Sequence, residues 1–160
     1  MNAAEQATNT SSGPNREYLS FSLGQEEYAV EILRVQEIRR MCPLTSLPHA
    51  PSKVCGVMNL RGAVVPVIDM RAALGLPAEE HGKFTVIIVL SVGKRTIGFV
   101  VDKVSDVLSI APTEIEQAPE LGGHVDASMI SGIARAQERF VVLLDIDRAA
   151  GLDVELAGLS

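Results

Sequence analysis

The amino-acid sequence predicts a mainly β protein made of two small barrels of about five short strands each, with a few short helices. Short β-branched runs recur along the chain, at residues 85–92 and 140–145 for example. The chain also matches itself at two nearly constant shifts, which indicates a duplicated unit. A unit of roughly sixty residues is only marginally stable alone, and barrel closure would remove its exposed strand edges.

Individual elements follow from local patterns. The strand pattern occurs at residues 17–23, 27–30, 85–92, 96–101 and 140–145. Short helical patterns occur at 32–35, 70–74 and 146–150, and Gly75 and Gly151 close the last two. Pro66 cannot donate a backbone hydrogen bond, so we expect its strand at a sheet edge or a bulge.

The internal repeat sets the expected domain organisation. A shift of 69 places residues 18–24 on 87–93, and a shift of 76 places Gly56 on Gly132 and Asp69 on Asp145. Ordered agreement of glycine, acidic and apolar positions favours a duplication over chance matching of apolar letters. We therefore expect units at about 18–75 and 87–151, each closing into a barrel and packing against the other with a groove between them.

The ends of the chain have a different composition. Residues 1–15 contain almost nothing to bury, so we expect a disordered tail there, and residues 153–160 form a second tail after a domain at 16–152. No signal pattern and no apolar run of transmembrane length is present. Cys42 and Cys55 have neither a CxxC nor a metal-ligand spacing, which favours free thiols in a reducing cytoplasm.

Composition and motifs exclude several function classes. The 160 residues carry a net charge of -6 and only 4% aromatics, so nucleic-acid binding and membrane insertion are not expected. His49, His81 and His124 show no ligand spacing, and neither a GxSxG elbow nor a phosphate loop occurs. We expect no metal, no cofactor and no catalysis. A β protein of this kind usually acts by binding.

One turn departs from its own repeat. Asn59-Leu60-Arg61-Gly62 aligns with Arg135-Ala136-Gln137-Glu138, so the repeated turn does not itself require an arginine at position 61. Arg61 either contacts a partner or forms an ion pair with an acid such as Glu37. Because surface ion pairs stabilise proteins weakly, the residues alone leave both alternatives open.

These features resemble the CheW family of bacterial chemotaxis adaptors. The resembling segments are EYLSFSLGQEEYAVEILRVQEIRR, GVMNLRGAVVPVIDMR, TVIIVLSVGKRTIGFVVDKVSDVLSI and IEQAPEL, in this order and spacing from residue 17 to about 151. The resemblance implies two five-stranded barrels similar to SH3 domains and no enzymatic activity. It also implies a cytoplasmic protein, recruited to membrane-associated arrays, that links chemoreceptor tips to the regulatory domain of the histidine kinase CheA.

The resemblance further implies two sets of contact residues. A helical receptor tip would dock between the barrels against Val35, Glu37, Gly56, Arg61, Gly62, Val86 and Val107. CheA would contact the barrel ends, through Glu116 and Leu121, and alternating rings of adaptor and kinase could form. At these two positions the family often has a basic residue and a large aromatic one. The rival functions are an adaptor of a non-flagellar chemosensory pathway and a small-ligand-binding double barrel.

Overall fold

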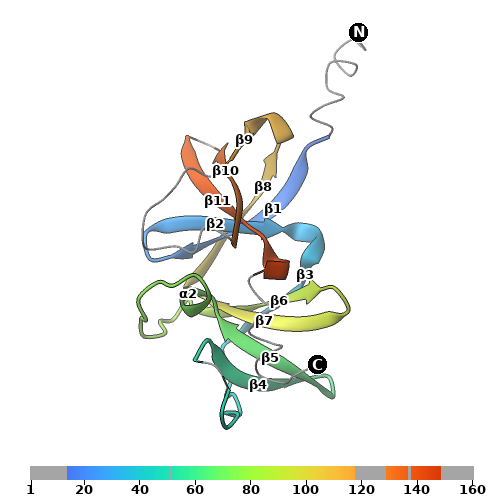
Figure 1. Cartoon of the computed structure of the whole chain (residues 1–160), viewed down its shortest axis with the longest axis vertical. Coiled ribbons are helices and arrows are strands. Elements are labelled where there is room, and N and C mark those ends of the chain that lie inside the picture. The colour runs from blue at the N-terminus through green and yellow to red at the C-terminus, as the bar shows by residue number, and fades with distance from the viewer. Residues whose placement is uncertain (1–13, 51, 118–128, 137, 149–160) are drawn as a thin grey trace.

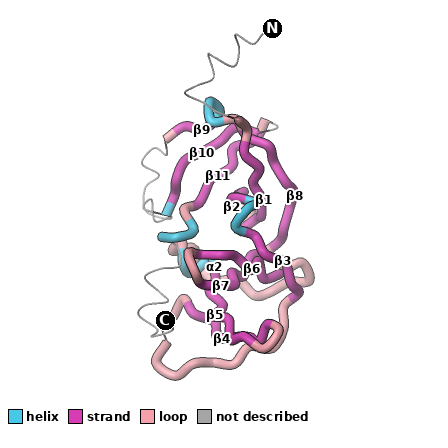
Figure 2. Tube along the Cα trace, turned by 90° about the vertical axis from the view of Figure 1, so that its right-hand side faces the viewer, coloured by secondary structure: helices cyan, strands magenta, loops and turns pink. Residues whose placement is uncertain are grey.

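The computed structural model describes residues 14–50, 52–117, 129–136 and 138–148. Two β-sheets lie one above the other along the long axis of the molecule (Figure 1, Figure 2). The first sheet, barrel 1, has the strand order β8-β1-β2-β11-β10-β9, and the second, barrel 2, has the order β3-β6-β7-β5-β4. The mainly β class with two small barrels is confirmed. No described helix is long and apolar enough to cross a membrane.

Five strands, β1, β2, β6, β7 and β11, agree closely with the bounds expected from the sequence pattern. Barrel 1 contains β1 (Arg16–Leu23), β2 (Glu26–Glu31), β8 (Lys103–Ile110), β9 (Ile115–Glu116), β10 (Ile130–Ala136) and β11 (Arg139–Leu144). Barrel 2 contains β3 (Val35–Arg40), β4 (Val54–Leu60), β5 (Ala63–Asp69), β6 (Val86–Val92) and β7 (Arg95–Val101).

The expectation that each sequence unit closes its own barrel is wrong. The hairpin β1–β2 of the first unit joins the strands β8, β10 and β11 of the second, and the hairpin β6–β7 joins β3, β4 and β5 of the first. Figure 1 shows this exchange as blue strands among gold and orange ones in barrel 1. Parallel pairing of β5 with β7, and of β11 with β2, attaches each hairpin to the other unit.

The strand pairing of one unit recurs in the other at positions related by the sequence shifts. Val35 pairs with Leu90, and the positions 69 residues away, Val104 and Phe21, pair in the same way. Each sheet also curls back on itself. In barrel 2, Thr45 forms a bridge with Val57 of β4, while β9 forms the corresponding closure with β10 in barrel 1. A chain segment after the edge strands β3 and β8 thus reaches the opposite edge of each sheet.

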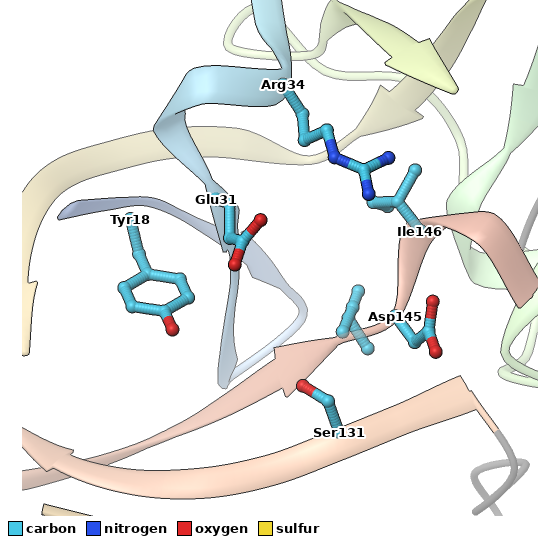
Figure 3. Close-up of a pocket in the computed structure, with 7 residues that line it drawn as sticks. Tyr18, Glu31, Arg34, Ser131, Asp145 and Ile146 are labelled. Atoms are coloured by element: carbon cyan, nitrogen blue, oxygen red, sulfur yellow. The ribbon is translucent and has the colours of Figure 1, made fainter. Parts of the chain in front are cut away.

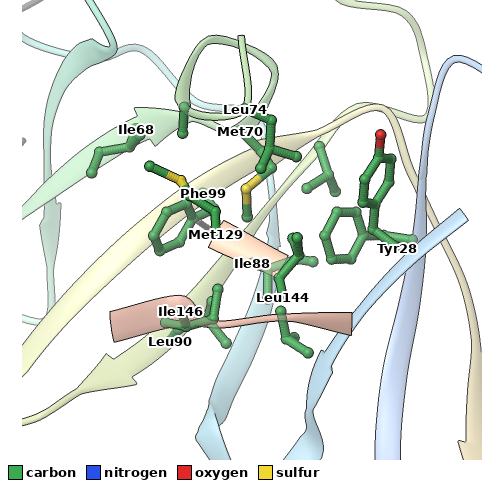
Figure 4. Close-up of a cluster of buried hydrophobic side chains, with 14 of the residues drawn as sticks. Tyr28, Ile68, Met70, Leu74, Ile88, Leu90, Phe99, Met129, Leu144 and Ile146 are labelled. Atoms are coloured by element: carbon green, nitrogen blue, oxygen red, sulfur yellow. The ribbon is translucent and has the colours of Figure 1, made fainter. Parts of the chain in front are cut away.

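Alternate faces of the exchanged strands supply two different cores. Ile87 and Val89 of β6 point into barrel 2, whereas Ile88 and Leu90 belong to the largest cluster, which contains residues of both barrels. Figure 4 shows this shared core, to which Leu90, Phe99 and Ile68 of barrel 2 and Tyr28 and Leu144 of barrel 1 all contribute. Strands buried on both faces explain the continuous apolar run at 86–90.

The helices are single turns. Residues 32–34 form the 3-10 turn η1 (Ile32–Arg34), which ends one residue before the predicted end of the helical pattern. Val35 is the first residue of β3. In α2 (Met70–Ala73), Asp69 Oδ1 accepts a hydrogen bond of 3.0 Å from the amide of Arg71, as an N-cap residue does. Residues 146–148 are helical as predicted, and 149–150 with Gly151 lie outside the described residues.

Of the two alternatives predicted for Pro66, the sheet edge is wrong and the bulge is close to what is found. Its strand β5 lies between β4 and β7, so it is an interior strand of barrel 2. The β4–β5 pair has a register shift between Val54 and Gly56, opposite the residues that follow Pro66. Parallel pairing with β7 begins at Val67, one residue after Pro66. The proline is tolerated because it precedes that ladder.

Ion pairs reinforce both places where the chain crosses between barrels. Arg71 of α2 donates to both carboxylate oxygens of Asp102, between β7 and β8, and Asp102 Oδ2 also accepts from the Gly24 amide at 2.8 Å. Near the other crossing, Arg34 of η1 donates to both oxygens of Asp147 at 3.0 and 3.2 Å. Arg71 and Asp147 occupy positions related by the shift of 76, so the two pairs have opposite polarity.

We expect Leu90→Ala to destabilise both barrels together. Leu90 is 1% exposed in the shared core, so the truncation should lower the free energy of unfolding by about 2–5 kcal/mol. Leu33→Ala is the matched control, because Leu33 is 94% exposed. Urea unfolding followed by circular dichroism measures both. Two separate transitions in the Leu90 variant would contradict a core common to the barrels.

We expect the Arg71–Asp102 pair to contribute to stability above about pH 4. The Arg71 guanidinium, helped by the Gly24 amide, holds the pKa of Asp102 below its ordinary value of 3.8, although burial raises it. A carboxylate with a lowered folded pKa stabilises the protein above its unfolded pKa, and that contribution is lost as the pH falls through the folded value. The melting temperature of Asp102→Asn should therefore lie below that of wild type at pH 6 and approach it as the pH falls below 3.8 and through the folded pKa. A difference independent of pH would contradict this assignment.

Candidate partner-binding site

The β4–β5 turn presents Arg61 at the tip of a tight hairpin. Leu60 pairs with Ala63, which leaves Arg61 and Gly62 as a two-residue loop with φ of 52° and 89°. Two positive φ values are typical of a type I′ turn, where glycine is favoured at the second position. The Gly62 amide donates to Asn59 Oδ1 at 2.9 Å, which fixes the loop. The Arg61 side chain is 68% exposed.

Glu37 of β3 binds that arginine. Arg61 Nη2 donates to Glu37 Oε2 at 2.5 Å, and Arg39 Nη1 donates to the other carboxylate oxygen at 3.3 Å. The Arg61 guanidinium, with a smaller effect from Arg39, holds the pKa of Glu37 below its usual range. The ion pair left open by the sequence therefore forms. Arg61 can still contact a partner, because most of its side chain remains exposed.

Gly56 has a structural role in the barrel closure. Its φ is 150°, and a Cβ there would lie 2.5 Å from the carbonyl oxygen of Thr45, the residue that bridges to Val57. The equivalent Gly132 lies as tightly against Ile115 and Glu116 of β9. Because both repeats need a glycine here, its presence is explained by close backbone approach, whatever partner the surface binds.

The predicted valines fall into two groups. Val35 and Val86 are half-buried and pack against the shared core. Val107 of β8 is 47% exposed and belongs to barrel 1. Glu116 is exposed in β9, and Leu121 lies outside the described residues. The structure therefore brings Glu37 of β3 together with Arg61 of the hairpin, next to Gly62. It places Val35 and Val86 at the margin of the shared core, whereas Val107 lies in the other sheet, paired with Leu19.

Sequence reasoning missed an open hollow at the junction of the barrels. It is lined by Arg40 at the end of β3, by residues 82–86 before and within β6, and by Lys103 and Val104 of β8. Phe84 in this lining is 59% exposed. An aromatic residue after Gly82-Lys83 in an otherwise polar loop was the available signal, but nothing local indicated that β8 would lie beside it.

A small polar pocket lies within barrel 1 at its side toward the helical turn 146–148 (Figure 3). Tyr18, Glu31 and Ser131 line it, together with Arg34, Leu144, Asp145 and Ile146. Burial and then the Glu31 carboxylate raise the pKa of Tyr18. Glu31 pairs with Arg16 at 2.9 Å. The charged side chains of this lining are paired with residues outside it: Arg34 pairs with Asp147 and Asp145 with Arg148. They do not form the nucleophile–base arrangement that covalent catalysis needs.

Other reactive groups among the described residues show no assembled site. No group of three or more His, Cys, Asp or Glu residues there could hold a metal ion. Cys42 and Cys55 are free and half-buried. Burial raises the pKa of the Cys55 thiol to about 11, with a smaller effect from Asp69. Because the thiolate is the reactive form, Cys55 is a poor nucleophile. The features that remain are surfaces suited to binding.

Known proteins share this sequence and architecture. The chain is 41% identical over 133 residues to the chemotaxis protein CheW of Klebsiella aerogenes, covering 83% of this chain and 80% of the relative. It is 40% identical over 146 residues to the chemotaxis protein CheW of Rhizobium meliloti, covering 91% and 92% of the two chains. The crystal structure of the scaffolding protein TtCheW from Thermoanaerobacter tengcongensis superposes with a TM-score of 0.78 at 28% identity, covering 86% of this chain and 88% of that one.

The family follows from the extent of the match. The sequence profile of the CheW-like domain matches residues 17–152, which include both barrels and the hairpin that carries Arg61. The resemblance found in the sequence is therefore confirmed, and this chain belongs to the family of CheW-like domain proteins.

Proposed function

We propose that this protein is a non-catalytic chemotaxis adaptor that couples chemoreceptors to the histidine kinase CheA. The observation that carries the proposal is the match to CheW-like proteins over both barrels, combined with an exposed Arg61 held in a defined turn. An adaptor acts by binding two partners at once, and it needs separate surfaces on a rigid body. The shared core supplies that rigidity by uniting the barrels.

The receptor would bind at the junction of the barrels and the neighbouring hairpin. A helix that docks in a groove needs apolar contacts and a few polar groups that fix its register. Val35, Val86 and Val107 would supply apolar contacts, while Arg61 and Glu37 would fix the register. The Glu37–Arg61 pair orients the guanidinium before binding, which lowers the entropy cost of ordering a long side chain.

The kinase would bind elsewhere, through the region of Glu116 and Leu121. Glu116 lies on the short edge strand β9 of barrel 1, whereas the β4–β5 hairpin belongs to barrel 2. Separate faces would allow one adaptor to hold a receptor and CheA together and to alternate with CheA in rings. We place this adaptor in the cytoplasm, recruited to receptor arrays at the membrane.

Reconstitution tests the adaptor function. We expect receptor-containing membranes to recruit CheA, and to control its autophosphorylation in response to attractant, only when this protein is added. The measurements are co-sedimentation of CheA and phosphate incorporation, with and without stimulus. Equal kinase recruitment and equal stimulus response in the absence of this protein would overturn the proposal.

We expect Arg61→Ala to weaken receptor binding by about tenfold while leaving the fold intact, because it removes a register-fixing contact at the edge of the site. Arg16→Ala is the matched control: Arg16 is also 68% exposed and also forms an ion pair, with Glu31. Calorimetric titration with a soluble receptor fragment measures affinity, and the melting temperature measures folding.

The alternative for Arg61 is a purely structural role. A loss of stability as large as that of Leu90→Ala, with unchanged receptor affinity, would establish it. A double-mutant cycle with Glu37→Gln separates the two contributions. The ion pair appears as non-additive effects of the two mutations on stability. Contact with the partner appears as their effect on receptor affinity.

A further inference from the structure

The hollow at the barrel junction combines an exposed aromatic ring with positive charge. Phe84 lies in the loop that leads into β6 and is 59% exposed. The Nζ atoms of Lys83 and Lys103 lie 5.2 and 5.8 Å from the centre of its ring. Arg40, at the end of β3, lines the same hollow. Two lysines therefore lie close to the ring, and a third cation, from β3, lines the same hollow.

The charge of this hollow opposes that of the whole chain. The protein has a net charge of -6, yet none of the described residues that line the hollow is acidic. Arg40, Lys83 and Lys103 form no ion pair with any described residue, whereas the guanidinium groups of Arg34, Arg61 and Arg71 all do. Each lysine is attracted to the ring, but the neighbouring cations also repel each other, and no acidic side chain in the lining offsets that repulsion.

Comparison of the repeats shows that the fold does not require a free cation there. Lys103 is equivalent to Arg34 by the shift of 69, and Arg34 is neutralised by Asp147. The position equivalent to Asp147 in the first unit is Arg71, which forms an ion pair with Asp102. The reversed polarity of that pair leaves Lys103 without an acidic partner among the described residues. Phe84 is equivalent to Asn15, so its exposed ring is also peculiar to the second unit.

Aromatic and cationic side chains grouped in this way favour one kind of partner. Interfaces are enriched in exposed aromatic anchors, and a desolvated ring adds apolar contact at low entropy cost. Half-buried Met41 and Val86 extend the apolar floor of the hollow around Phe84. Uncompensated cations at the rim select carboxylates and accelerate association with an acidic partner.

We propose that this hollow, defined by Arg40, Lys83, Phe84 and Lys103, binds a helical segment of the chemoreceptor whose carboxylates flank an apolar side chain. The apolar side chain packs on Phe84, and the carboxylates pair with the surrounding cations. The proposal rests on the proposed function for the identity of the partner. It adds that the receptor contact extends from Val86 onto the loop 82–85 and β8, and that it depends on charge.

The test is calorimetric titration of a soluble receptor fragment against variants of the full chain. We expect Lys83→Gln combined with Lys103→Gln, and separately Phe84→Ala, to weaken receptor binding about tenfold. The double variant should also show a smaller loss of affinity than wild type when salt is raised from about 50 to about 300 mM. All three residues are exposed or on loops, and melting temperatures check that folding is unchanged.

Matched controls exist on the same chain. Lys94→Gln removes an exposed lysine at the β6–β7 turn, and Phe140→Ala removes a ring that is 62% exposed and also contacts a cation, Arg135, at 5.1 Å. Both should leave receptor affinity unchanged. Equal losses in the control and hollow variants would overturn the proposal.

The remaining outcomes separate this proposal from the function. Wild-type receptor affinity in the hollow variants, together with a loss in Arg61→Ala, overturns the hollow and leaves the adaptor function intact. A loss of binding to the CheA regulatory domain alone makes the kinase the occupant and also overturns it. Absence of receptor binding by the wild-type protein itself would overturn the proposed function.

Discussion

The shared apolar core between the barrels is the constraint on which the rest of the structure depends. β1, β2, β6 and β7 direct one face into a barrel and the other into this core, so neither barrel has a complete interior without strands from the other sequence unit. The exchange makes the two halves one cooperative body. It also brings β3 and β8, which follow the crossing points between barrels, to the margin of that body.

That margin is where the binding features gather. Val35 and Val86 cover the edge of the shared core, and Phe84 with Lys103 forms the open hollow beside them. Arg61 reaches Glu37 across barrel 2 from a turn whose backbone is set by Gly62 and Asn59. The helix-binding groove that we propose would not require a conformational change. It follows from packing two barrels together and leaving the crossing strands partly uncovered.

The two repeats diverge mainly in charge, while their backbones agree. Gly56 and Gly132 meet the same close backbone approach, and the bulges near them fall at equivalent positions. In contrast, Arg71 of the first unit corresponds to Asp147 of the second. Arg34 and Lys103 are both cationic, but among the described residues only Arg34 has an acidic partner. Packing constrains the apolar and glycine positions in both copies because cavities and clashes cost stability. Charged surface positions are freer, and there the first and second units acquired different electrostatic roles.

The sequence by itself determined the strands β1, β2, β6, β7 and β11, the end of α2 before Gly75, and the family, because these depend on patterns within a few residues and on ordered motifs. It also identified Arg61 as a departure from its repeat. Only the tertiary structure decided which hairpin joins which barrel, and that Pro66 lies in an interior strand. It decided the Glu37–Arg61 pair and the meeting of Phe84 with Lys103 as well. These outcomes depend on contacts between residues distant in the chain, and a local pattern carries no information on which distant surface will cover it.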